Sequence, residues 1–187
     1  TNIVSISRKL VHLSVGYTDI GNDALIPIVT NLSQLQILNI SNCNISSEGL
    51  QYLSQLTSLN TLEISGNILN NISVLETLLS LTALEMNYCS ISAIIMDPLT
   101  NLKNLTSLGI AGNNLEDEGV SSLVQNLNKL EYLDISHNNI TIISARYIER
   151  YLPNIKELII DDDITQEGID LLNRLKYSED FFLQLPE

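Results

Sequence analysis

Few residues of this 187-residue chain have the types and the spacing that chemistry at a protein site requires. Cys43 and Cys89 could be nucleophiles or metal ligands, but no cluster of histidines accompanies them, and His12 and His137 lie far apart. The three aspartates at 161–163 could supply oxygen ligands to Ca²⁺, but they lack the alternating spacing and the glycine of a calcium loop. The common motifs of hydrolases, phosphate loops, zinc proteases and paired thiols are also missing from the sequence. We therefore predict that the protein is not an enzyme and uses no metal or other cofactor.

The charge and the composition exclude further classes of protein. The 22 acidic residues and nine Lys and Arg residues give a net charge of −13, so the summed field repels nucleic acids and anionic membrane surfaces. We expect neither a nucleic-acid partner nor a membrane partner. Hydrophobic residues make up 44% of the chain, aromatic residues make up 5%, and Trp is absent. This composition argues against disorder and predicts a core built mainly from Leu and Ile.

One apolar pattern, L-x-x-L-x-L-x-x-N-x-L, recurs along nearly the whole chain. Its spacing is 22 to 25 residues, and the seven copies begin at Leu10, Leu35, Leu59, Leu81, Leu105, Leu130 and Ile155. Positions 4 and 6 of the pattern are apolar, so they point to one face of a short strand, while positions 3, 5 and 7 point to the other. The segments between copies, such as 48–56 and 144–152, carry apolar residues at helical spacing. Since no copy can bury its apolar face alone, we predict an α/β solenoid with one parallel sheet and helices outside it.

Position 9 of the pattern tests this interpretation, because the chain turns there and leaves backbone polar groups facing the interior. Asn67, Asn113 and Asn138 occupy it in three copies and can satisfy those groups. Cys43 and Cys89 occupy the same position two copies apart. At about 4.8 Å per strand their separation is roughly 9–10 Å, which is too far for a disulfide without backbone movement. We therefore interpret both cysteines as structural.

These features resemble the leucine-rich-repeat proteins, and the resemblance covers residues from about 10 to 175. It implies a right-handed superhelix with the parallel sheet on the concave face and short helices on the convex face. Residues 45–50 (ISSEGL), 115–120 (LEDEGV) and 164–169 (ITQEGI) resemble the helix entries of ribonuclease-inhibitor-like and GALA-type repeats. The fourth copy, with Asp97, Pro98 and Leu99, resembles internalin-type repeats. The resemblance suggests a bacterial effector or a protist protein in the cytoplasm, or in the host cytosol if it is secreted.

The domain organisation follows from the repeats. We predict a single domain over residues 1–187, with a C-terminal cap or linker at 176–187. Phe181, Phe182, Leu183 and Leu185 could fold over the last repeat, but Pro186 fits a linker to a further domain equally well.

Positions 3, 5, 7 and 8 are where this family usually contacts its partner, and these columns contain no Lys or Arg. We expect acidic and large amphipathic side chains there to bind the partner, namely Glu63, Glu85, Tyr88, Tyr132, Asp134, His137, Glu157 and Asp161. The small residues Gly109, Ala111 and Gly112 predict a shallow depression between Tyr88 and Tyr132. A solvated acidic face kept for solubility is the alternative interpretation of the same residues.

The sequence therefore predicts a non-enzymatic, monomeric recognition module that binds a basic protein on its concave face. One alternative is that the chain is the substrate-recognition part of a larger effector or ubiquitin ligase. A purely structural or self-associating repeat is another.

Overall fold

The computed structural model describes residues 9–161, 164–174 and 182–185 of the chain. In these residues every copy of the pattern supplies one short strand at positions 3–5, and the strands join in chain order into one parallel sheet. The strands are β1 (His12–Ser14), β2 (Ile37–Asn39), β3 (Thr61–Glu63), β4 (Ala83–Glu85), β5 (Ser107–Gly109), β6 (Tyr132–Asp134), β7 (Glu157–Ile159) and β8 (Phe182–Gln184). The predicted α/β solenoid is confirmed.

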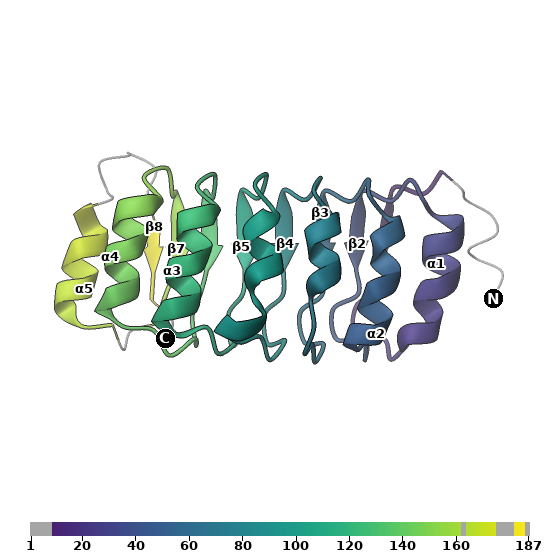
Figure 1. Cartoon of the computed structure of the whole chain (residues 1–187), viewed down its shortest axis with the longest axis horizontal. Coiled ribbons are helices and arrows are strands. Elements are labelled where there is room, and N and C mark those ends of the chain that lie inside the picture. The colour runs from purple at the N-terminus through teal and green to yellow at the C-terminus, as the bar shows by residue number, and fades with distance from the viewer. Residues whose placement is uncertain (1–8, 162–163, 175–181, 186–187) are drawn as a thin grey trace.

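The outer segments form one layer of helices over one face of the sheet (Figure 1). The α-helices are α1 (Leu25–Asn31), α2 (Ser47–Leu50), α3 (Glu116–Asn126), α4 (Ile142–Tyr151) and α5 (Gln166–Leu172). Short 3₁₀ helices add to them or replace them, namely η1 (Asn22–Ala24), η2 (Gln51–Gln55), η3 (Ser73–Thr77), η4 (Ala93–Ile95) and η5 (Asp97–Asn101). The copy from Leu59 to Leu81 has the shortest spacing, and η3 is its outer helix. The opposite face of the sheet is called the concave face below.

The core lies between the sheet and the helices. The central residue of a strand is fully buried in six neighbouring copies, and position 6 is fully buried beside it; these residues are Leu38, Leu62, Leu84, Leu108, Leu133 and Leu158, then Ile40, Ile64, Met86, Ile110, Ile135 and Ile160. Matching Leu residues are register partners in adjacent strands, for example Leu62 with Leu84. Because side chains alternate along a strand, positions 3 and 5 are directed to the concave face.

The asparagine column at position 9 makes the hydrogen bonds that the pattern predicts. Asn67 Oδ1 accepts from the Cys43 and Ile45 backbone N–H groups at 3.2 and 2.9 Å. Its Nδ2 donates to the Ile40 and Ile64 carbonyls at 2.9 and 2.8 Å. Asn113 and Asn138 repeat the arrangement in later copies. Each asparagine therefore joins its own turn to that of the preceding copy.

The two cysteines take part in the same column, as interpreted from the sequence. Both are buried free thiols. Cys43 Sγ donates to the Val15 carbonyl at 3.2 Å, and Cys89 Sγ donates to the Ile64 carbonyl at 3.3 Å. Burial raises the pKa of the Cys89 thiol to about 11. A thiol that stays protonated at neutral pH is a poor nucleophile, in agreement with a structural role.

The C-terminal segment continues the sheet. β8 pairs in parallel with β7, with Leu183 opposite Leu158. Leu183 and Leu185 are partly buried and pack against the core. Phe181 and Pro186, which carried the cap and linker interpretations, lie outside the described residues. In the described part of the chain, no helix has the length and apolar character that crossing a membrane requires.

Candidate functional site

The concave face is built from the strand positions 3 and 5 and from the turns that follow the strands. Position 8 of each turn has a left-handed backbone in six copies, with φ between 52° and 69°; the residues are Tyr17, Asn42, Gly66, Tyr88, Gly112 and His137. This conformation is uncommon for residues other than glycine, and least favourable for bulky ones. It aims the side chains of position 8 along the edge of the concave face.

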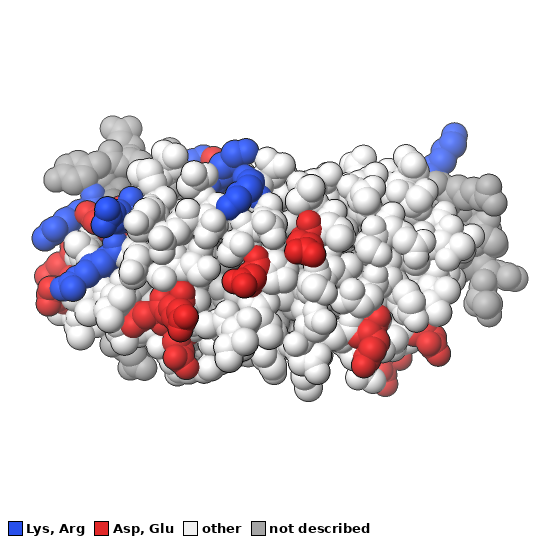
Figure 2. Space-filling model, in the orientation of Figure 1, with Lys and Arg blue, Asp and Glu red and all other residues white. Residues whose placement is uncertain are grey.

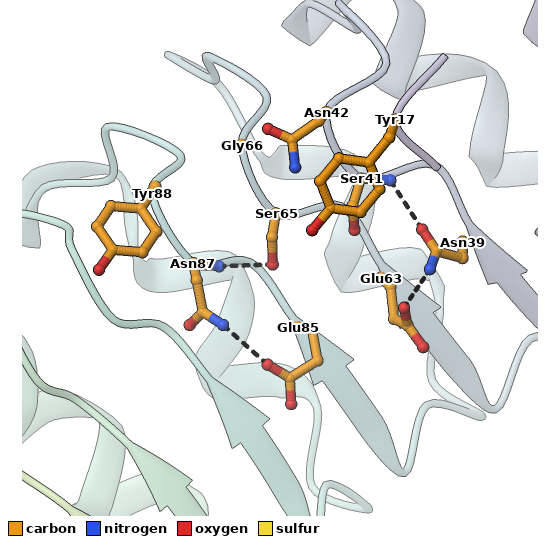
Figure 3. A pocket seen from close by; sticks show the side chains of 10 residues that line it. All are labelled: Tyr17, Asn39, Ser41, Asn42, Glu63, Ser65, Gly66, Glu85, Asn87 and Tyr88. Carbon is orange, nitrogen blue, oxygen red and sulfur yellow. Dashed lines mark hydrogen bonds between the residues drawn. The ribbon is translucent and has the colours of Figure 1, made fainter. Parts of the chain in front are cut away.

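A pocket of about 430 Å³ lies on the concave face over strands β2 to β4. Tyr17 and Tyr88 stand on opposite sides of it in Figure 3, and the carboxylates of Glu63 and Glu85 lie at the same end. The remaining lining residues are small or polar, namely Asn39, Ser41, Asn42, Ser65, Gly66 and Asn87. It is called the Tyr17–Tyr88 pocket below.

Hydrogen bonds within the pocket fix its polar side chains. Asn39 Nδ2 donates to Glu63 Oε2, and Asn87 Nδ2 donates to Glu85 Oε2 at 3.0 Å. Asn87 Oδ1 in turn accepts from the Ala111 backbone N–H at 2.7 Å. Because each asparagine also bonds to backbone, the carboxylates are held in place before any partner arrives.

Glu85 is the pocket residue with the clearest electrostatic perturbation. Burial raises its pKa, the hydrogen bond from Asn87 lowers it, and the negative charges of Asp134 and Glu63 raise it further. The net direction is upward, so the folded protein holds the ionised form of Glu85 at a cost. A positive charge that entered the pocket would remove that cost.

The two glycines behind the predicted depression between Tyr88 and Tyr132 do not leave open space. A Cβ atom on Gly109 would lie 1.9 Å from Glu85 Oε2, and one on Gly112 would lie 2.2 Å from the Tyr88 ring. The two neighbouring side chains therefore fill the space that the glycines leave. The glycines remain important, since they let Glu85 and Tyr88 lie close against the backbone.

The predicted site residues near the C-terminus serve mostly to hold turns. Asp134 Oδ1 accepts from the Ser136 backbone N–H at 3.1 Å and from its hydroxyl at 2.7 Å. Both Asp161 carboxylate oxygens accept from the His137 backbone N–H, at 2.6 and 2.7 Å, and His137 Nδ1 lies 3.2 Å from Oδ1. The side chain of His137 is still 56% exposed and can contact a partner.

Tyr132 lies between the two groups of acidic residues. Burial raises its pKa to about 12, and the carboxylates of Glu85, Asp134 and Glu157 add to the shift. The phenol therefore stays protonated and can donate a hydrogen bond. Glu157 is half-buried on the neighbouring strand β7.

Of the predicted site residues, the structure brings Glu63, Glu85 and Tyr88 together in the pocket and places the others beyond it. The prediction missed Tyr17, Asn39 and Asn42. The sequence could have indicated Tyr17, because it occupies position 8 of the first copy as Tyr88 does in the fourth. The described residues contain no group of three or more His, Cys, Asp or Glu side chains that could hold a metal ion. Asp162 and Asp163, the rest of the possible calcium ligands, lie outside them.

Sequence comparison places repeats along much of the chain. A family model described as leucine-rich repeat matches residues 103–163, and a second leucine-rich-repeat model matches residues 7–29 and 32–54. A search of curated proteins finds no significant match to the chain.

Structural comparison finds similar solenoids among the internalins. The crystal structure of the internalin inlF from Listeria monocytogenes has a TM-score of 0.75 and 23% identity and matches all of this chain. This chain spans only 51% of that protein. The internalin C2 (inlC2) from the same organism has a TM-score of 0.71 and 24% identity, over 94% of this chain and 80% of that one. At these identities the similarity concerns the fold.

Proposed function

This chain is a leucine-rich-repeat protein, and we propose that it is a non-catalytic recognition module that binds a basic protein partner on its concave face. One observation carries the proposal: a concave pocket contains two carboxylates in a stretch of chain without cations. Glu63 and Glu85 line the pocket, and the sequence has no Lys or Arg between Lys9 and Lys103. A complementary partner is therefore positively charged.

The distribution of Lys and Arg residues supports binding of a basic partner at the concave pocket. On the helix-covered face, Figure 2 shows Lys and Arg side chains mainly over the half of the molecule that holds α3, α4 and α5, and again at the opposite end. The ion pairs Arg146 with Glu167 and Lys156 with Glu131 both belong to the C-terminal half. The negative charge around the pocket is thus left for a partner to neutralise.

Preorganisation is the physical basis of the proposed activity. The stacked core fixes the strands, and the asparagine hydrogen bonds fix the side chains that point from them. Little conformational entropy is then lost when a partner docks, and exposed Tyr side chains supply contact area at low entropic cost. The acidic face also accelerates encounter with a basic surface, more strongly at low salt.

A capture experiment with two matched double variants tests the proposal. Glu63→Lys with Glu157→Lys reverses charge on the concave face, while Glu76→Lys with Glu118→Lys makes the same change at exposed positions on the helix side. The concave variant should lose a protein that the wild type and the helix-side variant both capture, and capture by the wild type should weaken as salt increases. Circular dichroism confirms that all three proteins are folded. Equal loss in both variants, or loss in neither, would contradict concave-face binding.

The second proposal is that this chain is the substrate-recognition part of a larger protein. The length of inlF supports it, since this chain spans 51% of that structure. Sequencing the full reading frame tests it: a catalytic domain joined to the repeats would support this proposal, and a frame without one would contradict it. The concave face would bind the substrate in the same way.

A further inference from the structure

The Tyr17–Tyr88 pocket has two aromatic walls that are unusually open to solvent. Tyr17 is 81% exposed and Tyr88 is 60% exposed. Exposing this much aromatic surface is unfavourable, and tyrosines are enriched among the residues that dominate binding energy. Both rings stand at the edge of a concave site rather than on an isolated loop.

The walls are also held in position. Both tyrosines occupy the left-handed position 8 of their turns, with φ of 61° and 55°. The Tyr88 ring lies against Gly112, where an added Cβ would be only 2.2 Å from two ring atoms. Between the two tyrosines, the Asn42 side chain lies as closely over Gly66, where an added Cβ would be 2.2 Å from Asn42 Oδ1.

The two carboxylates give the pocket its chemical preference. Glu63 and Glu85 are register partners in adjacent strands, so they lie side by side at one end of the pocket. The asparagine side chains donate to Oε2 of each carboxylate. Among the described residues, Oε1 of each has no hydrogen-bond donor and neither carboxylate forms an ion pair. A ligand with several donors in one plane can contact both.

We propose that the Tyr17–Tyr88 pocket is the anchor site for a single arginine side chain of the protein partner, an inference that rests on the proposed function. The planar guanidinium has five N–H donors, enough to reach both Glu63 and Glu85. Its faces stack on aromatic rings, so the guanidinium can pack against one of the two tyrosines. At about 430 Å³ the pocket has the size of a small-molecule site, so it accommodates one side chain with associated water.

Arginine fits this site better than lysine does. The lysine ammonium is a compact and strongly hydrated charge, so it reaches one carboxylate at a time and loses more hydration on entering a pocket. Glu63 Oε2 bonds to Asn39 on β2 and Glu85 Oε2 lies over Gly109 on β5, so the two carboxylates are separate acceptors. A fork of donors suits such a pair better than a point charge does. The pocket should therefore discriminate between the two cations as well as against neutral side chains.

A titration with three short peptides tests the inference. The probes are acetyl-Gly-Gly-Xaa-Gly-Gly-amide, in which Xaa is arginine, lysine or the neutral arginine analogue citrulline. Binding to the ¹⁵N-labelled protein is followed through the amide signals of Ser65, Gly66 and Asn87, which line the pocket. We expect saturable shifts with the arginine peptide, about tenfold weaker binding of the citrulline peptide, and intermediate binding of the lysine peptide.

Variants decide whether the pocket is responsible. Glu85→Gln should weaken arginine binding by about tenfold, and Tyr17→Ala by about threefold. Glu118→Gln removes the same charge at an exposed helix-side position outside the pocket and should leave the affinity unchanged. Thermal unfolding verifies that each variant is folded.

Three outcomes would overturn the inference: no saturable shift with the arginine peptide, equal affinity for the citrulline peptide, or equal weakening by Glu85→Gln and Glu118→Gln. The proposed function fails separately, in the capture experiment. Partner capture that depends on Glu63 and Glu157, together with a failed arginine titration, would leave concave-face recognition in place and remove only the arginine anchor.

Discussion

Acidic and amide side chains at position 5 of the repeat have different roles in different copies. Asn39 and Asp134 end strands β2 and β6, and each accepts a hydrogen bond from the backbone N–H two residues later, at 3.0 and 3.1 Å. Glu63 and Glu85 end strands β3 and β4 at the equivalent position, but they bond to asparagine side chains and line the pocket. A short side chain can close this local turn, whereas glutamate is one methylene longer and extends beyond it. Side-chain length therefore decides whether an acidic residue serves the fold or the surface.

The same contrast extends to the C-terminal half of the solenoid. Asp117 accepts hydrogen bonds from Thr141 and Ser144 at the start of α4, and Asp161 accepts from the His137 backbone. We call Asp117, Asp134 and Asp161 the backbone-holding aspartates, and Glu63 and Glu85 the pocket glutamates. The first set should matter for stability and the second for binding, and the following substitutions test this separation.

Asp117→Ala should have the largest effect on stability. The carboxylate accepts from the Thr141 N–H and hydroxyl at 2.9 and 2.6 Å, and from the Ser144 N–H and hydroxyl at 3.0 and 2.5 Å. Burial raises the pKa of Asp117, but these hydrogen bonds outweigh it and the net direction is downward. We expect a loss of about 2 kcal/mol, or roughly 4–8 °C in Tm, measured by circular dichroism. The exposed neighbour Glu118, changed to Ala, is the control; an equal loss there would contradict the assignment.

Asp161→Ala should lower stability by about 1.5 kcal/mol, or roughly 3–6 °C in Tm, because it removes both acceptors of the His137 N–H. The pocket glutamate variant Glu63→Ala should change stability by less than about 0.5 kcal/mol, as is usual for surface substitutions. Chemical denaturation of the two variants side by side measures the difference. If Glu63→Ala were as destabilising as Asp161→Ala, the separation of roles would be wrong.

Asp134→Glu tests the argument from side-chain length without changing the charge. The longer side chain should no longer close the turn at Ser136, which would cost about 1 kcal/mol, or roughly 2–4 °C in Tm. Asp134→Asn keeps both the length and an acceptor oxygen, so its loss should be smaller. Thermal unfolding at neutral pH distinguishes the two. A larger loss in Asp134→Asn than in Asp134→Glu would show that the charge of Asp134, rather than its length, stabilises the turn.

The sequence predicts those parts of the structure that depend on periodicity. The apolar spacing of two gives the strands and their inward faces, and the demand for buried hydrogen bonds gives the asparagine column at Asn67, Asn113 and Asn138. The repeat search missed the further strand at 182–184: Leu183 and Leu185 have the spacing of positions 4 and 6, but Asp180 stands where the first leucine of a copy would be.

The details of the candidate site could not be read from the repeat. Small residues at Gly109 and Gly112 predict free space, but neighbouring side chains compete to fill such space, and here Glu85 and Tyr88 do so. Asp134, Glu63 and Glu85 occupy position 5 of their copies, so the sequence predicts the same role for all three. The repeat position indicates where a carboxylate lies but not which hydrogen bonds it makes. Rotamers and local hydrogen bonds therefore determined where the pocket formed.

Glu85→Gln should have the smallest effect on stability and the opposite sign. Since burial holds the pKa of Glu85 above its usual value, the folded state binds its proton more tightly than the unfolded state does, and the ionised carboxylate costs stability at pH 7. That cost disappears as the pH falls through the folded-state pKa to below the usual value of 4.5. The Gln variant should thus have a Tm higher by on the order of 1 °C at pH 7, and the difference should vanish near pH 4. Glu76→Gln, an exposed change on the helix side, controls for the loss of one charge, and a difference that stayed constant with pH would contradict this account. The ionised carboxylate of Glu85 lines the pocket, so its charge is available for a cationic partner.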